Sequence, residues 1–296
     1  MSDALVLKWI LDTRPLWPEA KATKDLETAA SRALSLLTAD ERASVLRYHF
    51  VKDAKLALGS ALLKRHAISS ALGVPFSRAT PTPGPPPGRK PLFRRPDGTQ
   101  PLAFNVSHQA GLVALAAVRG DADGGADVGV DVVCPRERRE RDHALLGRDG
   151  WPAYVGMHES VFAAAECERL RDLGRRRGPD EALEYFYALW CLREAWVKMT
   201  GEALLAGWLG ELEMRNFAPP GAAAAADAPP LEVWFRGRRV GGGGGGGGGV
   251  YVRLERYLAD YMVCTVVRGD VGRRLGDGFE SVDLDALLDS AEKSSL

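Results

Sequence analysis

The chain has 296 residues, 46% apolar and 26% charged, with equal numbers of basic and acidic side chains. This composition is ordinary for a soluble protein that buries one large core or two smaller ones. A formal net charge of zero argues against a general nucleic-acid binder. The four cysteines are widely spaced, which disfavours a zinc site or a disulfide framework and predicts a reducing compartment, the cytoplasm.

Two further classes are disfavoured by the apolar pattern. The N-terminus lacks the basic start and long apolar core of a signal peptide. No uninterrupted apolar stretch reaches the ~18 residues that a membrane helix needs. We therefore expect no membrane association.

The first third of the chain predicts one strand followed by helices. Residues 5–11 are rich in branched and aromatic side chains, which favours a strand. Residues 24–37 have helical character, and Thr38 with Glu41 has the spacing of a capping box that starts another helix. A longer helical pattern runs from Lys52 to Leu72, and Gly73 is a plausible C-terminal stop.

The middle of the chain predicts a loop and three strands. Residues 79–101 are rich in proline, glycine and arginine, which indicates a loop. Strands are expected over 102–106 and 112–118, joined by a loop over 107–111, and over 127–133.

The remainder predicts helices followed by strands. Helices are expected over 155–173, over 180–205 and in the tail from Asp283, and strands over 231–235, 250–258 and 261–267. An alanine-rich tract (222–226) and nine consecutive glycines (241–249) predict flexible insertions over about 219–230 and 240–249.

Asp131 lies in the middle of an apolar strand, Val128-Gly129-Val130-Asp131-Val132-Val133. An ionised carboxylate is costly to bury without a partner, and backbone amides or an arginine would be the ordinary solution. Gln109 and His108 precede a neighbouring strand of the same predicted sheet. Carboxylate and amide oxygens suit Mg²⁺ and do not suit zinc. His108 has no second histidine at metal-ligand spacing, so we interpret it as a hydrogen-bond donor to a phosphate group.

Glu194 and Lys198 lie one turn apart on the helix predicted over 180–205. Such a pair is common on exposed helices, where it contributes roughly 0.2–0.5 kcal/mol. Here the surrounding residues are apolar and aromatic, which indicates a mostly buried helix, and Trp190 precedes Glu194 by one turn. Two carboxylates with a lysine beside one of them therefore suggest a magnesium site that handles phosphate.

A third group is basic. Lys52 lies at the start of the long early helix, and Arg89 and Lys90 lie in the proline-rich loop. Each of these three residues alone is typical of a cation on the protein surface. Together with Ser107 and His108 they would form a cradle for the phosphates of a nucleotide-containing substrate.

In order and spacing, these motifs resemble the 4′-phosphopantetheinyl transferases of the large, broad-specificity type found in fungi and animals. The residues that carry the resemblance are Lys52-Asp53-Ala54, Gly88-Arg89-Lys90-Pro91, Phe104-Asn105-Val106-Ser107-His108-Gln109, Val128-Gly129-Val130-Asp131-Val132 and Trp190-Cys191-Leu192-Arg193-Glu194-Ala195-Trp196-Val197-Lys198. The opening Trp9 to Arg14 is similar to fungal members in particular. The resemblance covers roughly residues 5–215.

The resemblance implies an α+β fold of two similar α/β subdomains related by a pseudo-twofold axis, with coenzyme A in the cleft between them. We expect the subdomains to span 1–125 and 126–296. The implied activity is holo-[acyl-carrier-protein] synthase: Mg²⁺-dependent transfer of the 4′-phosphopantetheine arm to a carrier serine, with release of 3′,5′-ADP.

The resemblance also implies a role for individual residues. Gln109, Asp131 and Glu194 would hold Mg²⁺ against the pyrophosphate, and Glu194 or Lys198 would help to deprotonate the attacking serine. The coenzyme A contacts would come from Lys52, Arg89, Lys90, Asn105, Ser107 and His108. Val133 stands where many bacterial members have a second carboxylate, and Arg193 replaces the more usual lysine.

The implied partners are the acyl and peptidyl carrier domains of polyketide, peptide and fatty acid synthases, and aminoadipate reductase. A monomer is expected, because both halves of the cleft belong to one chain. The main alternative is a coenzyme A- or carrier-binding protein without turnover, which the presence of Asp131, Glu194 and Lys198 disfavours. A metal-dependent phosphohydrolase is a third reading, but Val133 takes the place of its second aspartate.

Overall fold

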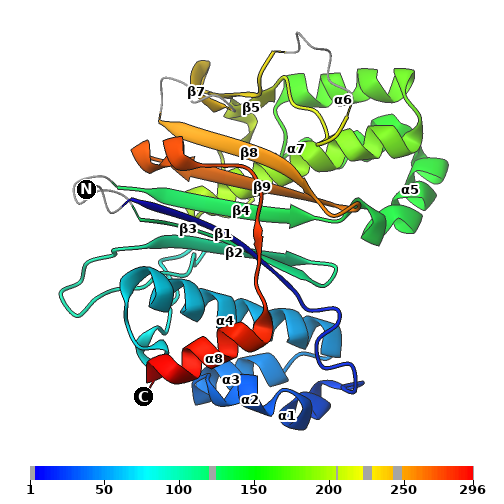
Figure 1. Ribbon diagram of the computed structural model, residues 1–296. Helices are drawn as coiled ribbons and strands as arrows, with labels where there is room; N and C mark the ends of the chain where they lie inside the picture. Colours follow the sequence, from blue (N-terminus) through cyan, green and yellow to red (C-terminus); the bar gives the residue numbers. More distant parts are fainter. Residues whose placement is uncertain (1–3, 120–124, 205, 223–228, 243–248, 296) are drawn as a thin grey trace.

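A computed structural model describes residues 4–119, 125–204, 206–222, 229–242 and 249–295 (Figure 1). Its strands are β1 (Leu5–Asp12), β2 (Ala103–Gln109), β3 (Leu112–Arg119), β4 (Asp127–Val133), β5 (Leu212–Arg215), β6 (Glu232–Phe235), β7 (Arg238–Gly242), β8 (Val250–Tyr257), β9 (Tyr261–Arg268) and β10 (Glu280–Ser281). Its α-helices are α1 (Leu26–Ala29), α2 (Ser31–Ser35), α3 (Ala39–Leu46), α4 (Val51–Leu72), α5 (Pro135–Gly156), α6 (Ala164–Arg176), α7 (Pro179–Thr200) and α8 (Leu284–Ser295). Mixed helices and strands confirm the α+β class.

The strands form two sheets whose topology repeats. The first has the order β10-β1-β3-β2 and the second the order β4-β9-β8-β7-β6-β5. In each half a strand pairs antiparallel with the far strand of a hairpin, β1 with β3 and β4 with β9. Each half also contains a 22-residue helix, α4 or α7. This repetition is what a pseudo-twofold relation between the halves requires.

Period-two alternation along the strands places the sheets in a layered arrangement of helices, sheet, sheet and helices (Figure 1). One face of β1 and β3, including Trp9 and Leu115, packs against α4 and α8. Their opposite face, including Ile10 and Ala114, packs on β4 and β9 between the two sheets. The far face of the second sheet packs against α5, α6 and α7.

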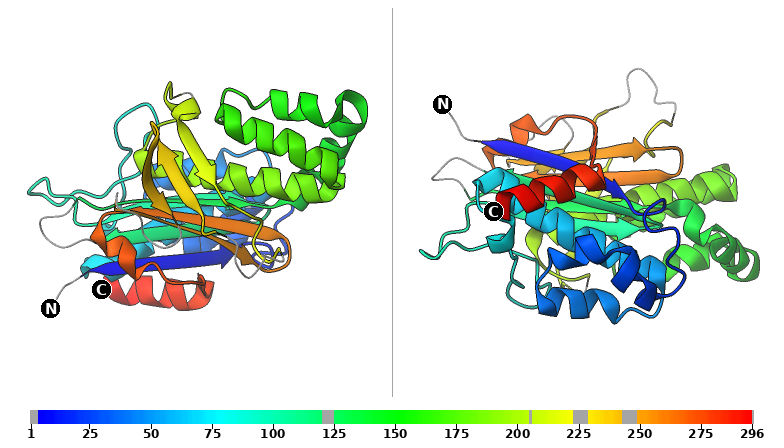
Figure 2. Two further views of the ribbon diagram at one scale, coloured as in Figure 1. Left: turned by 90° about the horizontal axis from the view of Figure 1, so that it is seen from above. Right: turned by 60° about the horizontal axis from the view of Figure 1, so that its bottom comes forward.

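The last described segment returns to the first half of the chain. β10 pairs in parallel with β1, and Leu284, Leu287 and Leu288 of α8 belong to the same core as α4. Arg32 of α2 forms ion pairs with three acidic residues along α8, Asp285, Asp289 and Glu292. Figure 2 shows α8 lying across this half beside β1. The predicted boundary between two subdomains near residue 125 therefore stays a prediction. In the folded protein, β10 and α8 pack on the first half of the chain.

The predicted elements of the first half are largely confirmed. The side chain and backbone of Thr38 and Glu41 form the predicted capping box at α3, and Gly73 ends α4 with a φ of 64°. Residues 24–37 form a short 3₁₀ turn followed by α1 and α2, interrupted at Ala30. The loop predicted over 107–111 is wrong. β2 continues to Gln109 because the turn needs only Ala110 and Gly111, both at positive φ.

The second half contains one long helix that the sequence pattern did not predict. α5 begins at Pro135 in its first turn and carries the arginine-rich stretch on an exposed surface, with a break at Gly150, where φ is 79°. The predicted helix over 155–173 is therefore wrong at its start, since α6 begins at Ala164. The predicted helix over 180–205 ends at Thr200, because Gly201 takes the left-handed conformation.

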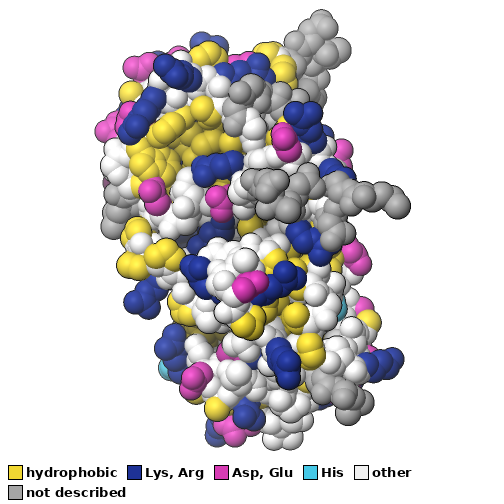
Figure 3. Space-filling model, turned by 90° about the vertical axis from the view of Figure 1, so that its left-hand side faces the viewer, with side chains coloured by type: hydrophobic (Ala, Val, Ile, Leu, Met, Phe, Trp, Pro, Cys, Tyr) yellow, Lys and Arg dark blue, Asp and Glu magenta, His cyan; other side chains and the backbone are white. Residues whose placement is uncertain are grey.

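Strands β6, β8 and β9 confirm the predicted strands, whereas β5, β7 and β10 were not predicted. Gly241 and Gly242 of the glycine tract belong to β7 and pair with β8, so the tract is not wholly an insertion. Most of that tract and most of the alanine-rich tract lie outside the described residues. On the face shown in Figure 3, basic and acidic side chains are interspersed around an apolar patch. No described helix has both the length and the apolar stretch needed to cross a bilayer.

Two contacts fix α7 on the second sheet. Gly129 of β4 faces the helix so closely that an added Cβ would lie 2.0 Å from the Ala195 carbonyl oxygen and 2.4 Å from the Met199 nitrogen. Arg193 is fully buried, pairs with the equally buried Glu166 of α6, and donates to the carbonyls of Leu209 and Leu212 at 2.8 and 2.9 Å. These contacts hold the neighbouring Glu194 and Lys198 against β4.

Replacing Gly129 with alanine should force α7 away from β4. We expect Gly129→Ala to lower the free energy of unfolding by about 2–3 kcal/mol, the usual cost of overpacking. Urea denaturation followed by circular dichroism measures this difference. Gly147→Ala is the matched control, because nothing lies within 4 Å of its added Cβ and alanine favours a helix interior. Equal stability of Gly129→Ala and wild type would contradict the close approach.

Candidate active site at the junction of the two sheets

The two sheets meet where the edge strand β2 runs beside the edge strand β4. Alternate side chains of β2 take the place of a backbone partner for β4. The oxygens of Asn105, Ser107 and Gln109 accept hydrogen bonds from the backbone N–H groups of Val130 (3.0 Å), Val132 (3.4 Å) and Cys134 (3.2 Å). The step is two residues on both strands, so every second residue of β2 points at β4. This ladder sets the register between the halves of the chain.

Asp131 lies at the centre of this junction and is 4% exposed. Its Oδ1 accepts hydrogen bonds from the Ser107 hydroxyl at 2.9 Å and from the Lys198 ammonium at 2.5 Å. Lys198 also donates to Ser107 Oγ at 2.9 Å. Oδ2 of Asp131 takes no hydrogen bond from a described residue. The carboxylate is thus half satisfied within the protein.

Glu194 lies one turn before Lys198 on α7 and forms no hydrogen bond or ion pair with any described residue. Burial raises the pKa of Glu194, against the attraction of Lys198 and together with the repulsion of Asp131. For Lys198, burial alone would lower the pKa, but the charges of Asp131 and Glu194 and the hydrogen bond to Asp131 outweigh it, so the pKa is raised. Lys198 is therefore a cation between two carboxyl groups.

These groups suit a hard cation. An unpaired, largely buried carboxylate and an open carboxylate oxygen beside it are the donor types that Mg²⁺ prefers. The third predicted ligand, Gln109, is engaged elsewhere: its oxygen accepts from Cys134 N–H, and its amide nitrogen donates to Glu137 at 2.9 Å. Among the described residues, no three His, Cys, Asp or Glu side chains gather at metal-binding spacing. The ligand set Gln109, Asp131 and Glu194 remains a prediction.

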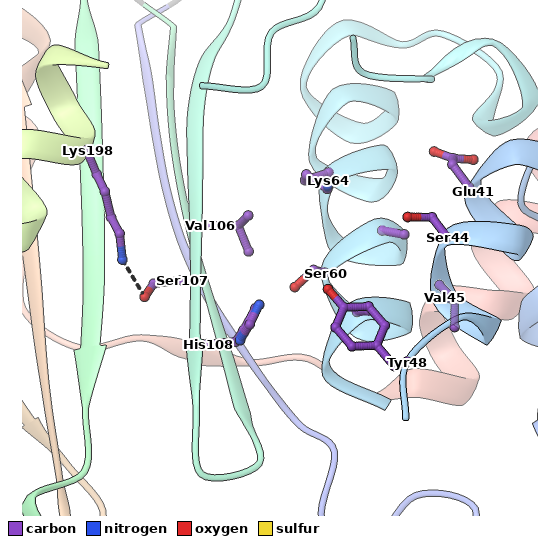
Figure 4. Close-up of a pocket in the computed structure, with 12 residues that line it drawn as sticks. Glu41, Ser44, Val45, Tyr48, Ser60, Lys64, Val106, Ser107, His108 and Lys198 are labelled. Atoms are coloured by element: carbon purple, nitrogen blue, oxygen red, sulfur yellow. Dashed lines mark hydrogen bonds between the residues drawn. The ribbon is translucent and has the colours of Figure 1, made fainter. Parts of the chain in front are cut away.

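A cleft of about 460 Å³ opens beside Asp131, between β2, the end of α7 and helices α3 and α4. Figure 4 shows Ser107, His108 and Lys198 on one side, with Tyr48, Ser60 and Lys64 opposite. Burial and then the charge of Lys198 lower the pKa of His108, which keeps its imidazole neutral at neutral pH. The cleft thus joins residues from both halves of the chain.

The structure brings only part of the predicted phosphate cradle together. Ser107 and His108 line the cleft, but Lys52 lines a neighbouring cavity of about 350 Å³ with Arg14 and Gly111. Lys90 donates to Asp127 Oδ1 at 3.3 Å and to the Met199 carbonyl at 3.0 Å, so its loop packs against the end of α7. Arg89 lies in the same loop at a φ of 48°. Asn105 is buried and bonded to β4, which is a structural role.

The sequence analysis missed the wall of the cleft formed by α3 and α4. Ser60 and Lys64 lie one turn apart on α4, and the three residues between them, Ala61, Leu62 and Leu63, are apolar and buried. The Ser60 hydroxyl is buried and has no hydrogen-bond partner among the described residues. Such a group facing a cleft is what a bound polar ligand would satisfy. Two polar residues one turn apart, on either side of the apolar run 61–63, were the signal available in the sequence.

Comparisons with known proteins identify the family of this chain. Residues 24–120 match the N-terminal domain of 4′-phosphopantetheinyl transferases, and residues 127–227 match the 4′-phosphopantetheinyl transferase superfamily. The chain is 52% identical to 4′-phosphopantetheinyl transferase 1 of Fusarium mangiferae, over 99% of this chain and 98% of that protein.

Two more distant relatives extend the pattern. The 4′-phosphopantetheinyl transferase NpgA of Emericella nidulans is 31% identical over 90% of this chain and 83% of its own length. The L-aminoadipate-semialdehyde dehydrogenase-phosphopantetheinyl transferase of Schizosaccharomyces pombe is 25% identical over 67% of this chain and 69% of its own length. The chain therefore belongs to the 4′-phosphopantetheinyl transferases, enzymes that transfer the phosphopantetheine arm of coenzyme A to carrier proteins.

Proposed function

We propose that this enzyme transfers the arm with the help of Mg²⁺ held by Asp131 and Glu194, with Gln109 as the third predicted ligand. The observation that carries the proposal is the unpaired Glu194 carboxyl beside the half-satisfied Asp131, whose partners Ser107 and Lys198 line the cleft between the two halves. When bound, Mg²⁺ would neutralise the pyrophosphate charge and stabilise the departing 3′,5′-ADP.

The protein's own residues then have separate roles. The carrier serine oxygen forms a bond to the phosphorus that bears the pantetheine arm, the bond from that phosphorus to the bridging oxygen breaks, and the serine loses its proton. Glu194 is the better base of the two predicted candidates. Lys198, with its raised pKa, is protonated and holds no electron pair for the proton, whereas the Glu194 carboxylate has one. Lys198 instead supplies positive charge to the phosphates.

The finer identity of the partners follows the relatives. We infer acyl and peptidyl carrier domains of polyketide, peptide and fatty acid synthases, and aminoadipate reductase, as acceptors. One relative's name refers to aminoadipate-semialdehyde dehydrogenase, which supports the last of these. The cleft is formed within one chain, which supports a monomer. The buried, unbridged cysteines Cys134, Cys167, Cys191 and Cys264 are consistent with a cytoplasmic location.

Removing either carboxylate should stop transfer. We expect Asp131→Ala and Glu194→Ala to lower the rate of transfer at least about 100-fold, because the loss of a metal-binding group exceeds the effect of disturbing its surroundings. The measurement is the intact mass of an apo acyl carrier protein incubated with coenzyme A and Mg²⁺, with an EDTA control. Asp149→Ala, which removes an exposed carboxylate of α5, should keep wild-type activity. Full transfer by either site variant, or in EDTA, would refute the metal assignment.

His108 should contribute to coenzyme A binding as a neutral hydrogen-bonding group. We expect His108→Ala to raise the dissociation constant for coenzyme A about fivefold to tenfold, equivalent to roughly 1–1.4 kcal/mol. Isothermal titration calorimetry measures this directly. His143→Ala is the matched control, since His143 bonds Asp180 on the surface away from the cleft. An unchanged dissociation constant in His108→Ala would remove His108 from the binding site.

Glu194 should destabilise the metal-free protein when ionised. Its folded pKa lies above the ordinary value of 4.5, so the stability associated with its protonated form is full below pH 4.5 and is lost as the pH rises through the folded pKa. We therefore expect Glu194→Gln to be more stable than wild type at pH 7 in EDTA, with the difference vanishing at acid pH.

The measurement for Glu194→Gln is the urea unfolding midpoint across pH 4–8. Added Mg²⁺ should raise the midpoint of wild type and leave that of the variant unchanged. A variant less stable than wild type at pH 7 in EDTA would show that the ionised carboxylate has a partner.

A further inference from the structure

Gln109 is the last member of the side-chain ladder between β2 and β4, and both ends of its amide have partners. Its oxygen accepts a hydrogen bond from the Cys134 N–H at 3.2 Å, which continues the pattern of the ladder. Its amide nitrogen donates to Oε2 of Glu137 at 2.9 Å, in the first turn of α5. Gln109 therefore joins three elements of the fold, β2, the end of β4 and the start of α5.

The two partners of this amide belong to one turn of backbone. The Glu137 N–H donates to the Cys134 carbonyl at 3.1 Å where α5 begins, so the backbone holds the two residues at a fixed spacing. Pro135 lies between them and restricts the backbone further, because its ring fixes φ. The start of α5 thus presents one donor and one acceptor to Gln109 in a set arrangement.

This arrangement selects one orientation of the Gln109 amide. A glutamine amide can turn by about 180°, which exchanges its oxygen and its nitrogen. The Cys134 N–H can only donate and the Glu137 carboxylate can only accept, so a turned amide would place N–H against N–H and oxygen against oxygen. With both partners in place, the oxygen is directed at the end of β4 and the nitrogen at α5.

The orientation matters because only the oxygen suits the predicted metal. Mg²⁺ takes oxygen ligands, including the side-chain carbonyl of glutamine, and an amide nitrogen in that place would not bind it. An amide oxygen has two lone pairs, and the Cys134 N–H is its one donor among the described residues. Gln109 also lies one ladder step beyond Ser107, whose hydroxyl donates to Asp131. The contacts that engage Gln109 thus leave its oxygen able to serve as a ligand.

We propose that Glu137 is a positioning residue, which directs the Gln109 oxygen toward the Mg²⁺ site and keeps its nitrogen away. The inference rests on the proposed function, in which Gln109 is the third ligand. Glu137 acts through Gln109 and not as a ligand itself, since no third carboxylate gathers with Asp131 and Glu194 in the described part of the chain.

The test is the dissociation constant for Mg²⁺, measured by isothermal titration calorimetry on the protein saturated with coenzyme A, with a titration into coenzyme A alone subtracted. We expect Glu137→Ala to raise this constant about tenfold, the usual effect of removing a group that orients a metal ligand. Its dissociation constant for coenzyme A in EDTA should change less than about twofold, because the nucleotide cleft is lined by other residues.

Two further variants separate orientation from charge. Glu137→Gln loses the charge but keeps an oxygen that accepts from the Gln109 amide, so its Mg²⁺ constant should stay within about twofold of wild type. Glu140→Ala is the matched control, because it removes an exposed carboxylate one turn later on the same helix. Equal weakening in Glu137→Ala and Glu137→Gln would show a general effect of charge and would overturn the positioning role.

A double variant shows whether Glu137 acts through Gln109. In a Gln109→Ala background, Glu137→Ala should weaken Mg²⁺ binding no further, because there is no amide left to orient. A loss that persists in that background would overturn the proposal. Mg²⁺ binding by wild type that Glu137→Ala leaves unchanged would overturn the positioning role alone. A wild-type protein that binds coenzyme A but no Mg²⁺ would refute the proposed metal site, and the positioning role with it.

Discussion

The side-chain ladder between β2 and β4 is the contact on which the site depends. Two sheet edges that meet without a shared backbone ladder leave N–H groups that need acceptors, and Asn105, Ser107 and Gln109 supply them at every second residue. Ser107 of this ladder also donates a hydrogen bond to Asp131 and therefore helps to set where the buried carboxylate lies relative to α7. At the other edge of the second sheet, Glu166 accepts from the Met214 N–H and Arg169 donates to its carbonyl, so that edge is also closed by side chains.

Charge is not balanced within the site, and this imbalance is compatible with its chemistry. Lys198 is one cation shared between Asp131 and Glu194, while the rest of α7 is held by apolar packing and by the buried Arg193–Glu166 pair. The buried ion pair of Arg193 thus lies on a different side of α7 from Lys198, which lines the cleft. Unpaired charge in a binding site lowers the free energy of unfolding, and apolar packing elsewhere in the protein offsets this loss.

The sequence predicted the residues whose environment conflicts with their chemistry. Asp131 in an apolar strand, and Glu194 with Lys198 in an apolar helix, are unusual in any fold, so local pattern was enough to select them. The ladder could not be predicted, because it depends on the register of two strands about 25 residues apart. Lys52 and Lys90 were grouped with the site by residue type, but their distance from it depends on tertiary packing. The helix α5 was missed because its charged first turns have no apolar stripe and its second half contains Gly147, Gly150 and Pro152.

The return of β10 and α8 to the first half has a consequence for how the chain is made. Apolar residues of α8 complete a core whose other members lie on β1, β3 and α4. During synthesis the first sheet therefore remains without its outer strand and part of its helical cover until residues 280–295 have left the ribosome, a delay set by translation at ~5–20 residues per second. The first half folds to completion only after the second half exists, so maturation of the two halves is concerted and not sequential.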